Sequence, residues 1–161
     1  VDAAPRSLSA QYGTGAFPFH TDAAHHALPP RYVLLRLADG ARTTTPTLLA
    51  VIDLAALSPQ DRRTLTREQW LVNGGRGRVF YSPILDPRRQ LIRFDPGCMS
   101  EPGGTTLQGH EIVDAALQDT GVITIGWYPK RTVIFDNWRV LHARPATDEK
   151  TRALLRIMVS A

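Results

Sequence analysis

Short runs of apolar and β-branched residues, separated at regular intervals by turn residues, constrain the fold of this chain most strongly. Runs of about four to eight such residues between glycine, proline and aspartate are typical of β-strands. Only two stretches, 53–65 and 110–118, carry the spacing and the capping residues of helices. We therefore predict a mainly β fold, a sandwich or barrel with minor helices. The expected strands cover residues 16–20, 32–37, 47–52, 69–72, 78–85, 90–94, 122–127, 132–136, 140–143 and 153–160.

Length and composition fit a single domain over residues 1–161, in which residues 1–15 form an irregular lead-in rich in alanine, serine and glycine. The chain has 161 residues, of which 43% are hydrophobic and 21% charged, as in ordinary globular proteins. No apolar run reaches the length of a membrane span. Cys98 is the only cysteine, so no internal disulfide can form. These features favour a cytoplasmic protein without a membrane partner.

The formal net charge of +4 raises the question of nucleic-acid binding. The arginines are scattered singly and in pairs, such as Arg62 with Arg63, and no nucleic-acid motif accompanies them. We therefore expect a small, anionic molecule as the partner and no nucleic acid.

His20 and Asp22 are candidates for a metal site because they lie two residues apart in a run expected to be extended. Residues two apart in a strand point to the same face, so both side chains can reach one ion. His142, near the other end of the chain, is the best candidate for a third ligand. Two imidazoles and one carboxylate on one face of an octahedron leave positions for substrate and oxygen, as in oxygen-activating iron(II) sites.

Each of these residues also has a purely structural explanation. A His-x-Asp pair occurs by chance in surface turns and salt links, and a lone histidine such as His142 is often a core residue with satisfied hydrogen bonds. His25 and His26 lie close by, but neighbours in a strand point to opposite faces, so at least one faces away. The pattern alone leaves a metal site and a set of structural side chains both open.

The sequence around these candidates resembles the taurine dioxygenase family of Fe(II)- and 2-oxoglutarate-dependent oxygenases, and in its middle region the related clavaminate synthase-like enzymes. The matching motifs occur in the family's order over nearly the whole chain. Together they indicate the family more specifically than any single motif does. They are His20-Thr21-Asp22 with Pro29-Pro30, Thr45-Pro46-Thr47-Leu48, Ile84-Leu85 to Ile92-Arg93-Phe94, Trp127-Tyr128-Pro129, Phe135-Asp136-Asn137 through to Leu141-His142, and the arginines Arg152 and Arg156.

This resemblance implies a double-stranded β-helix, or jelly roll, in agreement with the strand-rich pattern. It also implies Fe(II), 2-oxoglutarate and O2 as metal and cosubstrates, and hydroxylation of a C–H bond in a small anionic or amino-acid-like metabolite as the reaction. The roles that it implies are iron binding for His20, Asp22 and His142, 2-oxoglutarate binding for Thr47 and Arg152, and substrate binding for Arg156. Halogenating relatives replace the carboxylate at the position of Asp22, so its presence here favours oxygenation.

Two other functions remain open at this stage. A cupin-like metal-dependent isomerase or lyase uses similar ligands but has no need of Thr47 or the arginine pair. A non-catalytic jelly-roll homologue would keep the fold as a binding module. The gap after His142 varies among relatives, so Arg152 and Arg156 could exchange roles. The segment before His20 is also shorter than in the family, at nineteen residues. Trp127 is expected in the core. Asn137 is expected in a turn, with a hydrogen bond to a ligand histidine as the alternative.

Overall fold

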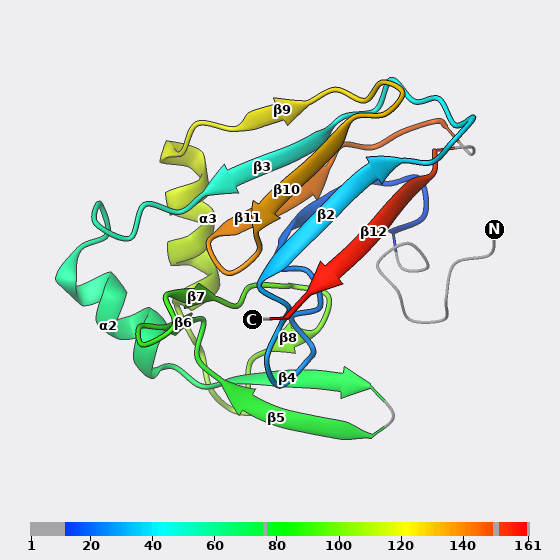
Figure 1. The fold of residues 1–161 in the computed structure, drawn as a ribbon. Coiled ribbons are helices and arrows are strands. Elements are labelled where there is room, and N and C mark those ends of the chain that lie inside the picture. Colours follow the sequence, from blue (N-terminus) through cyan, green and yellow to red (C-terminus); the bar gives the residue numbers. More distant parts are fainter. Residues whose placement is uncertain (1–11, 76, 150–151, 161) are drawn as a thin grey trace.

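A computed structural model of the chain describes residues 12–75, 77–149 and 152–160. Its strands form two main antiparallel sheets (Figure 1). Sheet A contains, in spatial order, β1 (Phe17–His20), β11 (Val140–Arg144), β3 (Thr47–Val51) and β9 (Ile123–Ile125). Sheet B contains β10 (Thr132–Asp136), β2 (Tyr32–Leu37) and β12 (Leu154–Val159). The mainly β, jelly-roll prediction is confirmed.

Side chains from both main sheets meet in one apolar cluster, because alternate residues of each strand point inward. Val33 and Phe135 reach it from sheet B, and Leu49 and Ile125 from sheet A. The opposite face of sheet A, represented by the fully buried Leu141, packs into a second and larger cluster. Sheet A therefore has a core on each face, and its side towards sheet B forms the interior of the jelly roll.

The second cluster is built by two short sheets and two helices. One sheet has the order β5 (Arg78–Ser82), β4 (Trp70–Gly75), β8 (Met99–Ser100), and the other pairs β6 (Leu85–Asp86) with β7 (Leu91–Ile92). Helices α2 (Pro59–Arg67) and α3 (Gly109–Asp119) contribute Leu65 and Val113 to this core. In the described part of the chain, no helix is long and apolar enough to cross a membrane.

The predicted helix at 53–65 begins too early, because α2 starts at Pro59. Asp53 accepts a hydrogen bond from the Ala55 N–H, which makes a local turn instead of a helix cap. Ser58 is the actual N-cap, since its hydroxyl accepts from the Asp61 N–H at 3.0 Å, and proline follows at the favoured first position. The predicted strand 78–85 is also wrong as one element, because it divides into β5 and β6 around Pro83.

The outer face of sheet B is unusually apolar for a surface exposed to solvent. Ile134, Leu155 and Ile157 lie on it with 62%, 52% and 60% of their surfaces exposed. The register places Ile134 and Ile157 on either side of Leu34 in the central strand, so the three side chains form a row across the sheet. The inner face of the same sheet is packed, so the two faces differ sharply in their contacts.

His110 in α3 gives the fold a predictable response to acid. Its ring stacks on Trp70 with centroids 3.8 Å apart and meets the edge of Phe94. Burial lowers the pKa of His110 below its ordinary value of 6.5, against the opposing attraction of nearby carboxylates. A histidine with a lowered pKa in the folded state binds more protons when unfolded, so its stabilising contribution is full above pH 6.5 and is lost as the pH falls.

We therefore expect the thermal unfolding midpoint to drop between about pH 7.5 and about pH 5.5, and to drop less steeply in His110→Phe, which keeps the stacked ring. Thermal melts across this pH range measure both slopes. An unchanged slope in the variant would contradict the assignment to His110.

Candidate functional site

The inner face of sheet A carries three of the residues singled out by the sequence. His20 on β1 is directly paired with His142 on β11, and His142 is paired with Leu49 on β3. Directly paired residues share a face, and Thr47 shares it with Leu49 because it lies two residues earlier. The Phe135 ring of sheet B lies 5.4 Å from the His142 ring, centroid to centroid, so this face looks into the interior between the sheets.

The two histidines lie side by side in forms suited to metal binding. Their ring centroids are 4.1 Å apart. His20 Nδ1 lies 2.9 Å from the carbonyl oxygen of Pro18, which can only accept, so Nδ1 carries a proton and Nε2 is the nitrogen left for a ligand. Burial, followed by the repulsion of His20, lowers the pKa of His142 well below its usual range. Burial thus favours the neutral imidazole for His142, the form that binds metals.

Asp22 is buried, and two different residues hold it in place. The side-chain amide of Asn137 accepts from the Asp22 N–H at 2.7 Å and donates to the Asp22 carbonyl at 3.0 Å. The Asp22 carboxylate forms an ion pair with Arg156, with 2.6 Å between Oδ1 and Nη1. The other carboxylate oxygen, Oδ2, is buried and has no hydrogen-bond partner. Asp22 therefore has a fixed backbone and one free oxygen.

The three proposed metal ligands are close neighbours but do not form a closed site. Among residues 12–75, 77–149 and 152–160, no three histidine, cysteine, aspartate or glutamate side chains could hold a metal ion as they stand. Asp22 is directed to Arg156, whereas His20 and His142 face each other. The donor types nevertheless suit a divalent metal, and the buried Asp22 Oδ2 and His142 Nδ1 are the kind of unpaired atoms that a ligand normally satisfies. The residues fit the metal, provided that Asp22 turns from Arg156.

A second cluster gathers around the hydroxyl of Thr47, which is buried at the start of β3. Arg152 Nη2 and Trp127 Nε1 both donate to Thr47 Oγ1, each at 3.1 Å. Burial, followed by the repulsion of Arg144, lowers the pKa of Arg152 to about 10, so its guanidinium stays charged near neutral pH. No carboxylate of the described residues forms a salt bridge with Arg152. Glu149 attracts Arg152 from beyond salt-bridge distance. A partly buried charge without a direct ion pair is suited to an anionic ligand.

The two arginines have separate partners. Arg156 lies on the inner face of β12, paired with Leu35, and reaches Asp22. Arg152 precedes β12 and reaches Thr47. The Arg156 side chain is 51% exposed, whereas Arg152 is more buried. The structure thus joins one arginine to the metal-ligand cluster and the other to the Thr47 cluster.

Sequence reasoning missed the role of Arg93, which lies beneath the loop that follows Asp22. Its buried guanidinium donates to three backbone carbonyls of that loop, those of Ala24, His26 and Ala27. A single arginine in a short strand gives no sign of such a role, because the acceptors lie more than 60 residues away in sequence. Asn137 was expected to make a turn or to hydrogen-bond a ligand histidine, and its contacts with Asp22 were equally hidden.

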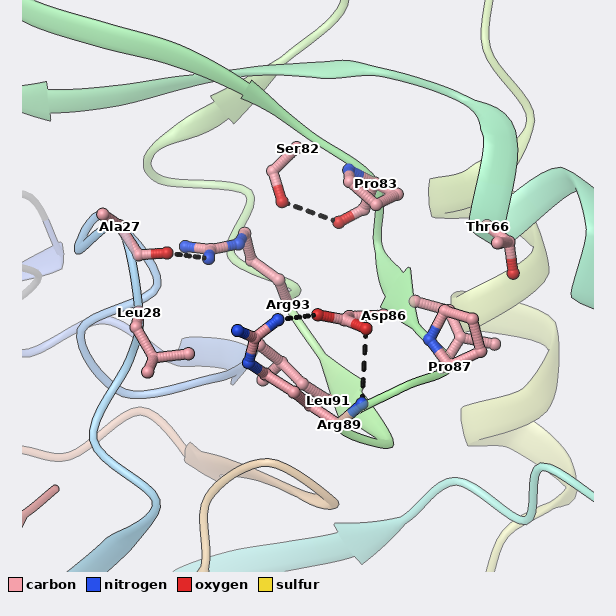
Figure 2. Close-up of a pocket in the computed structure, with 11 residues that line it drawn as sticks. Ala27, Leu28, Thr66, Ser82, Pro83, Asp86, Pro87, Arg89, Leu91 and Arg93 are labelled. Carbon is pink, nitrogen blue, oxygen red and sulfur yellow. Dashed lines mark hydrogen bonds and ion pairs between the residues drawn. The ribbon is translucent and has the colours of Figure 1, made fainter. Parts of the chain in front are cut away.

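Arg93 also lines a cavity of about 270 Å³, together with Ala27 and Leu28 of this loop. Figure 2 shows the Arg93 guanidinium against Ala27, with the Asp86–Arg89 ion pair across the space from Ser82. None of the proposed metal or cosubstrate ligands lines this cavity. The cavity and the candidate metal site thus have no lining residue in common.

Comparison with known proteins identifies structures of the same fold. No family model matches the chain, and no curated protein matches it. Among solved structures, asparagine oxygenase with Fe(II), 3-hydroxyasparagine and succinate aligns with a TM-score of 0.72 and 20% identity, over 92% of this chain and 51% of that one. The non-haem iron oxygenase OrfP with Fe and α-ketoglutaric acid aligns with a TM-score of 0.67 and 24% identity, over 89% of this chain and 49% of that one.

An OrfP variant bound to (3S)-hydroxy-L-arginine aligns with a TM-score of 0.68 and 25% identity, again over 89% and 49% of the two chains. The present chain therefore spans about half the length of the solved structures it matches. Its fold is that of the non-haem iron and 2-oxoglutarate oxygenases to which it aligns.

Proposed function

We propose that this chain is the catalytic core of a non-haem Fe(II)- and 2-oxoglutarate-dependent oxygenase that hydroxylates a small, amino-acid-like substrate. The observation that carries the proposal is the adjacency of two clusters on one interior face. Two imidazoles meet on paired strands, and on the next strand a threonine hydroxyl meets an arginine that forms no salt bridge with the described residues. The aligned structures, which contain iron with α-ketoglutarate or succinate, support the same assignment.

His20, Asp22 and His142 would hold Fe(II), and Thr47 and Arg152 would bind the distal carboxylate of 2-oxoglutarate. A guanidinium and a hydroxyl that both donate to one carboxylate fix its orientation as well as its charge. Bound iron with 2-oxoglutarate and O2 supplies the oxidising power to hydroxylate an unactivated C–H bond, with release of succinate and CO2. The chain's own contribution is to position these molecules and exclude water, with Phe135 packed against His142 on the interior side.

Arg156 would bind an anionic group of the substrate. Its guanidinium is half exposed and lies beside Asp22, so a carboxylate arriving from solvent can reach it without entering the core. Binding that carboxylate would also release Asp22 from its ion pair. The aligned enzymes, asparagine oxygenase and OrfP, were solved with hydroxylated amino acids, which supports an amino-acid-like substrate.

The two other functions weighed from the sequence explain less. A cupin-like isomerase or lyase leaves the Arg152–Thr47–Trp127 contacts without a purpose. A non-catalytic binding module leaves unexplained why Asp22 Oδ2 and His142 Nδ1 are buried without partners. Each such buried atom costs about 1 to 3 kcal/mol unless a ligand compensates it.

The decisive experiment is an anaerobic titration of the metal-free protein with Fe(II) and then 2-oxoglutarate, following the weak visible charge-transfer band of the chelate. We expect the band in the wild-type protein and in His26→Ala, and its loss in His142→Ala. His26 is the matched control because it is an exposed histidine beside the candidate ligands. Absence of the band in the wild type, together with no succinate formed under oxygen, would refute the proposal.

A further inference from the structure

The Thr47 hydroxyl is held in one orientation because both of its lone pairs already accept hydrogen bonds. A hydroxyl offers one hydrogen to donate and two lone pairs to accept. Thr47 Oγ1 accepts from Trp127 Nε1 at 3.1 Å and from Arg152 Nη2 at 3.1 Å. Neither an indole N–H nor a guanidinium can accept a hydrogen bond. The hydrogen of Thr47 must therefore point to a third partner.

Within the described residues, no oxygen or nitrogen accepts that hydrogen, since both recorded bonds of Thr47 Oγ1 are acceptor bonds. The hydrogen is consequently available to a ligand beside Arg152. A hydroxyl and a guanidinium that both donate into one space select a carboxylate, which only accepts.

We propose that Trp127 is a positioning residue for the cosubstrate, in that its indole N–H fixes the Thr47 hydroxyl as a donor to the carboxylate bound by Arg152. This inference rests on the proposed function. Without the indole N–H, one lone pair of Thr47 is free, and the hydroxyl can rotate to accept from water or donate elsewhere. Binding then has to include the cost of reorienting the hydroxyl, a cost that a preorganised donor avoids.

The packing of Trp127 explains how the indole can hold this position. The residue follows β9, and its ring packs against the apolar cluster between the two sheets. Its N–H therefore reaches Thr47 from a side chain that is already immobilised. Packing and hydrogen bonding can be separated experimentally, because Trp127→Phe keeps an aromatic ring in the core and removes the N–H.

A double-mutant cycle on 2-oxoglutarate affinity tests the inference. Wild type, Trp127→Phe, Thr47→Val and the double variant are titrated anaerobically with 2-oxoglutarate in the iron-loaded form, and their thermal unfolding midpoints are measured in parallel. We expect Trp127→Phe to weaken binding about 3- to 10-fold, the range of one neutral hydrogen bond. The double variant should bind as Thr47→Val does, because the indole acts only through the hydroxyl.

Trp70→Phe is the matched control, since Trp70 lies in the other core and its N–H has no hydrogen-bond partner. It should leave 2-oxoglutarate affinity unchanged even if it lowers the unfolding midpoint. If Trp127→Phe lowers 2-oxoglutarate affinity by the same factor in the wild type and in Thr47→Val, the role of Trp127 is packing only. That result would overturn the inference. So would unchanged affinity in Trp127→Phe while the wild type binds. A wild type that binds no 2-oxoglutarate would instead refute the proposed function itself.

Discussion

Replacing Arg152 with alanine should weaken 2-oxoglutarate binding roughly 30- to 1000-fold, which corresponds to about 2 to 4 kcal/mol. The guanidinium is partly buried, bonded to Thr47 and without a salt-bridge partner among the described residues, so a bound carboxylate would be its principal counter-ion. Without the Arg152 guanidinium, the carboxylate of 2-oxoglutarate would lose its water on binding and gain only the hydrogen bond of the Thr47 hydroxyl. Anaerobic titration of the iron-loaded protein with 2-oxoglutarate measures the change.

Arg156→Ala is the informative comparison, and it should weaken 2-oxoglutarate binding less than about tenfold. Its side chain is half exposed and directed to Asp22, so it makes no contact with the Thr47 cluster. Arg63→Ala on the exposed face of α2 controls for the loss of one positive charge. If Arg156→Ala proves the more damaging of the two, the roles of the arginines are exchanged.

Replacing Asn137 with alanine should lower the free energy of unfolding by about 3 to 9 kcal/mol, even in the metal-free protein. The Asn137 side chain is fully buried and makes three bonds to backbone groups, two with Asp22 and one at 2.8 Å with the Pro30 carbonyl. Alanine leaves all three groups buried without partners, at about 1 to 3 kcal/mol each. Urea unfolding followed by fluorescence measures the loss, which is comparable with the whole stability of many domains.

Asn73→Ala is the matched control, because Asn73 is the chain's other asparagine and accepts a single bond, from the Gly75 N–H, at an exposed strand end. It should cost less than about 1 kcal/mol. A comparably small loss in Asn137→Ala would show that water or a shifted backbone replaces the contacts, and that Asn137 does not hold Asp22 in place.

The fold was predictable where local pattern and packing agree. Strands β2 and β10 match the predicted 32–37 and 132–136 to the residue, because alternate side chains enter one core. Strand β8 was not predicted, since its two residues are extended only through pairing with β4. The early start of the helix at 53–65 arose from two competing cap signals, of which Ser58 followed by proline prevailed.

The candidate site was less predictable than the fold, because its contacts join distant parts of the chain. Periodicity placed His20 and Asp22 in or beside an extended segment, but it could not determine that His20 is paired with His142. The sequence offered His142 as a candidate third ligand, but it did not predict that the two strands are paired. The engagement of Asp22 by Arg156 and of three loop carbonyls by Arg93 depends on where the loop after β1 lies. No local pattern encodes such contacts, and the roles of the proposed ligands stay predictions until metal binding is measured.

Among the described residues, strand β1 pairs in sheet A with β11 alone, so the candidate site depends on contacts between distant parts of the chain. Asp22 and the Asn137 amide that holds its backbone are 115 residues apart in sequence. Contacts over such separations form late in folding, because much of the chain entropy must be lost before they add stability. During synthesis, His20 leaves the ribosome long before His142 exists. If His20, Asp22 and His142 bind a metal as proposed, that site would be complete only after the two ends of the chain have come together in the folded protein.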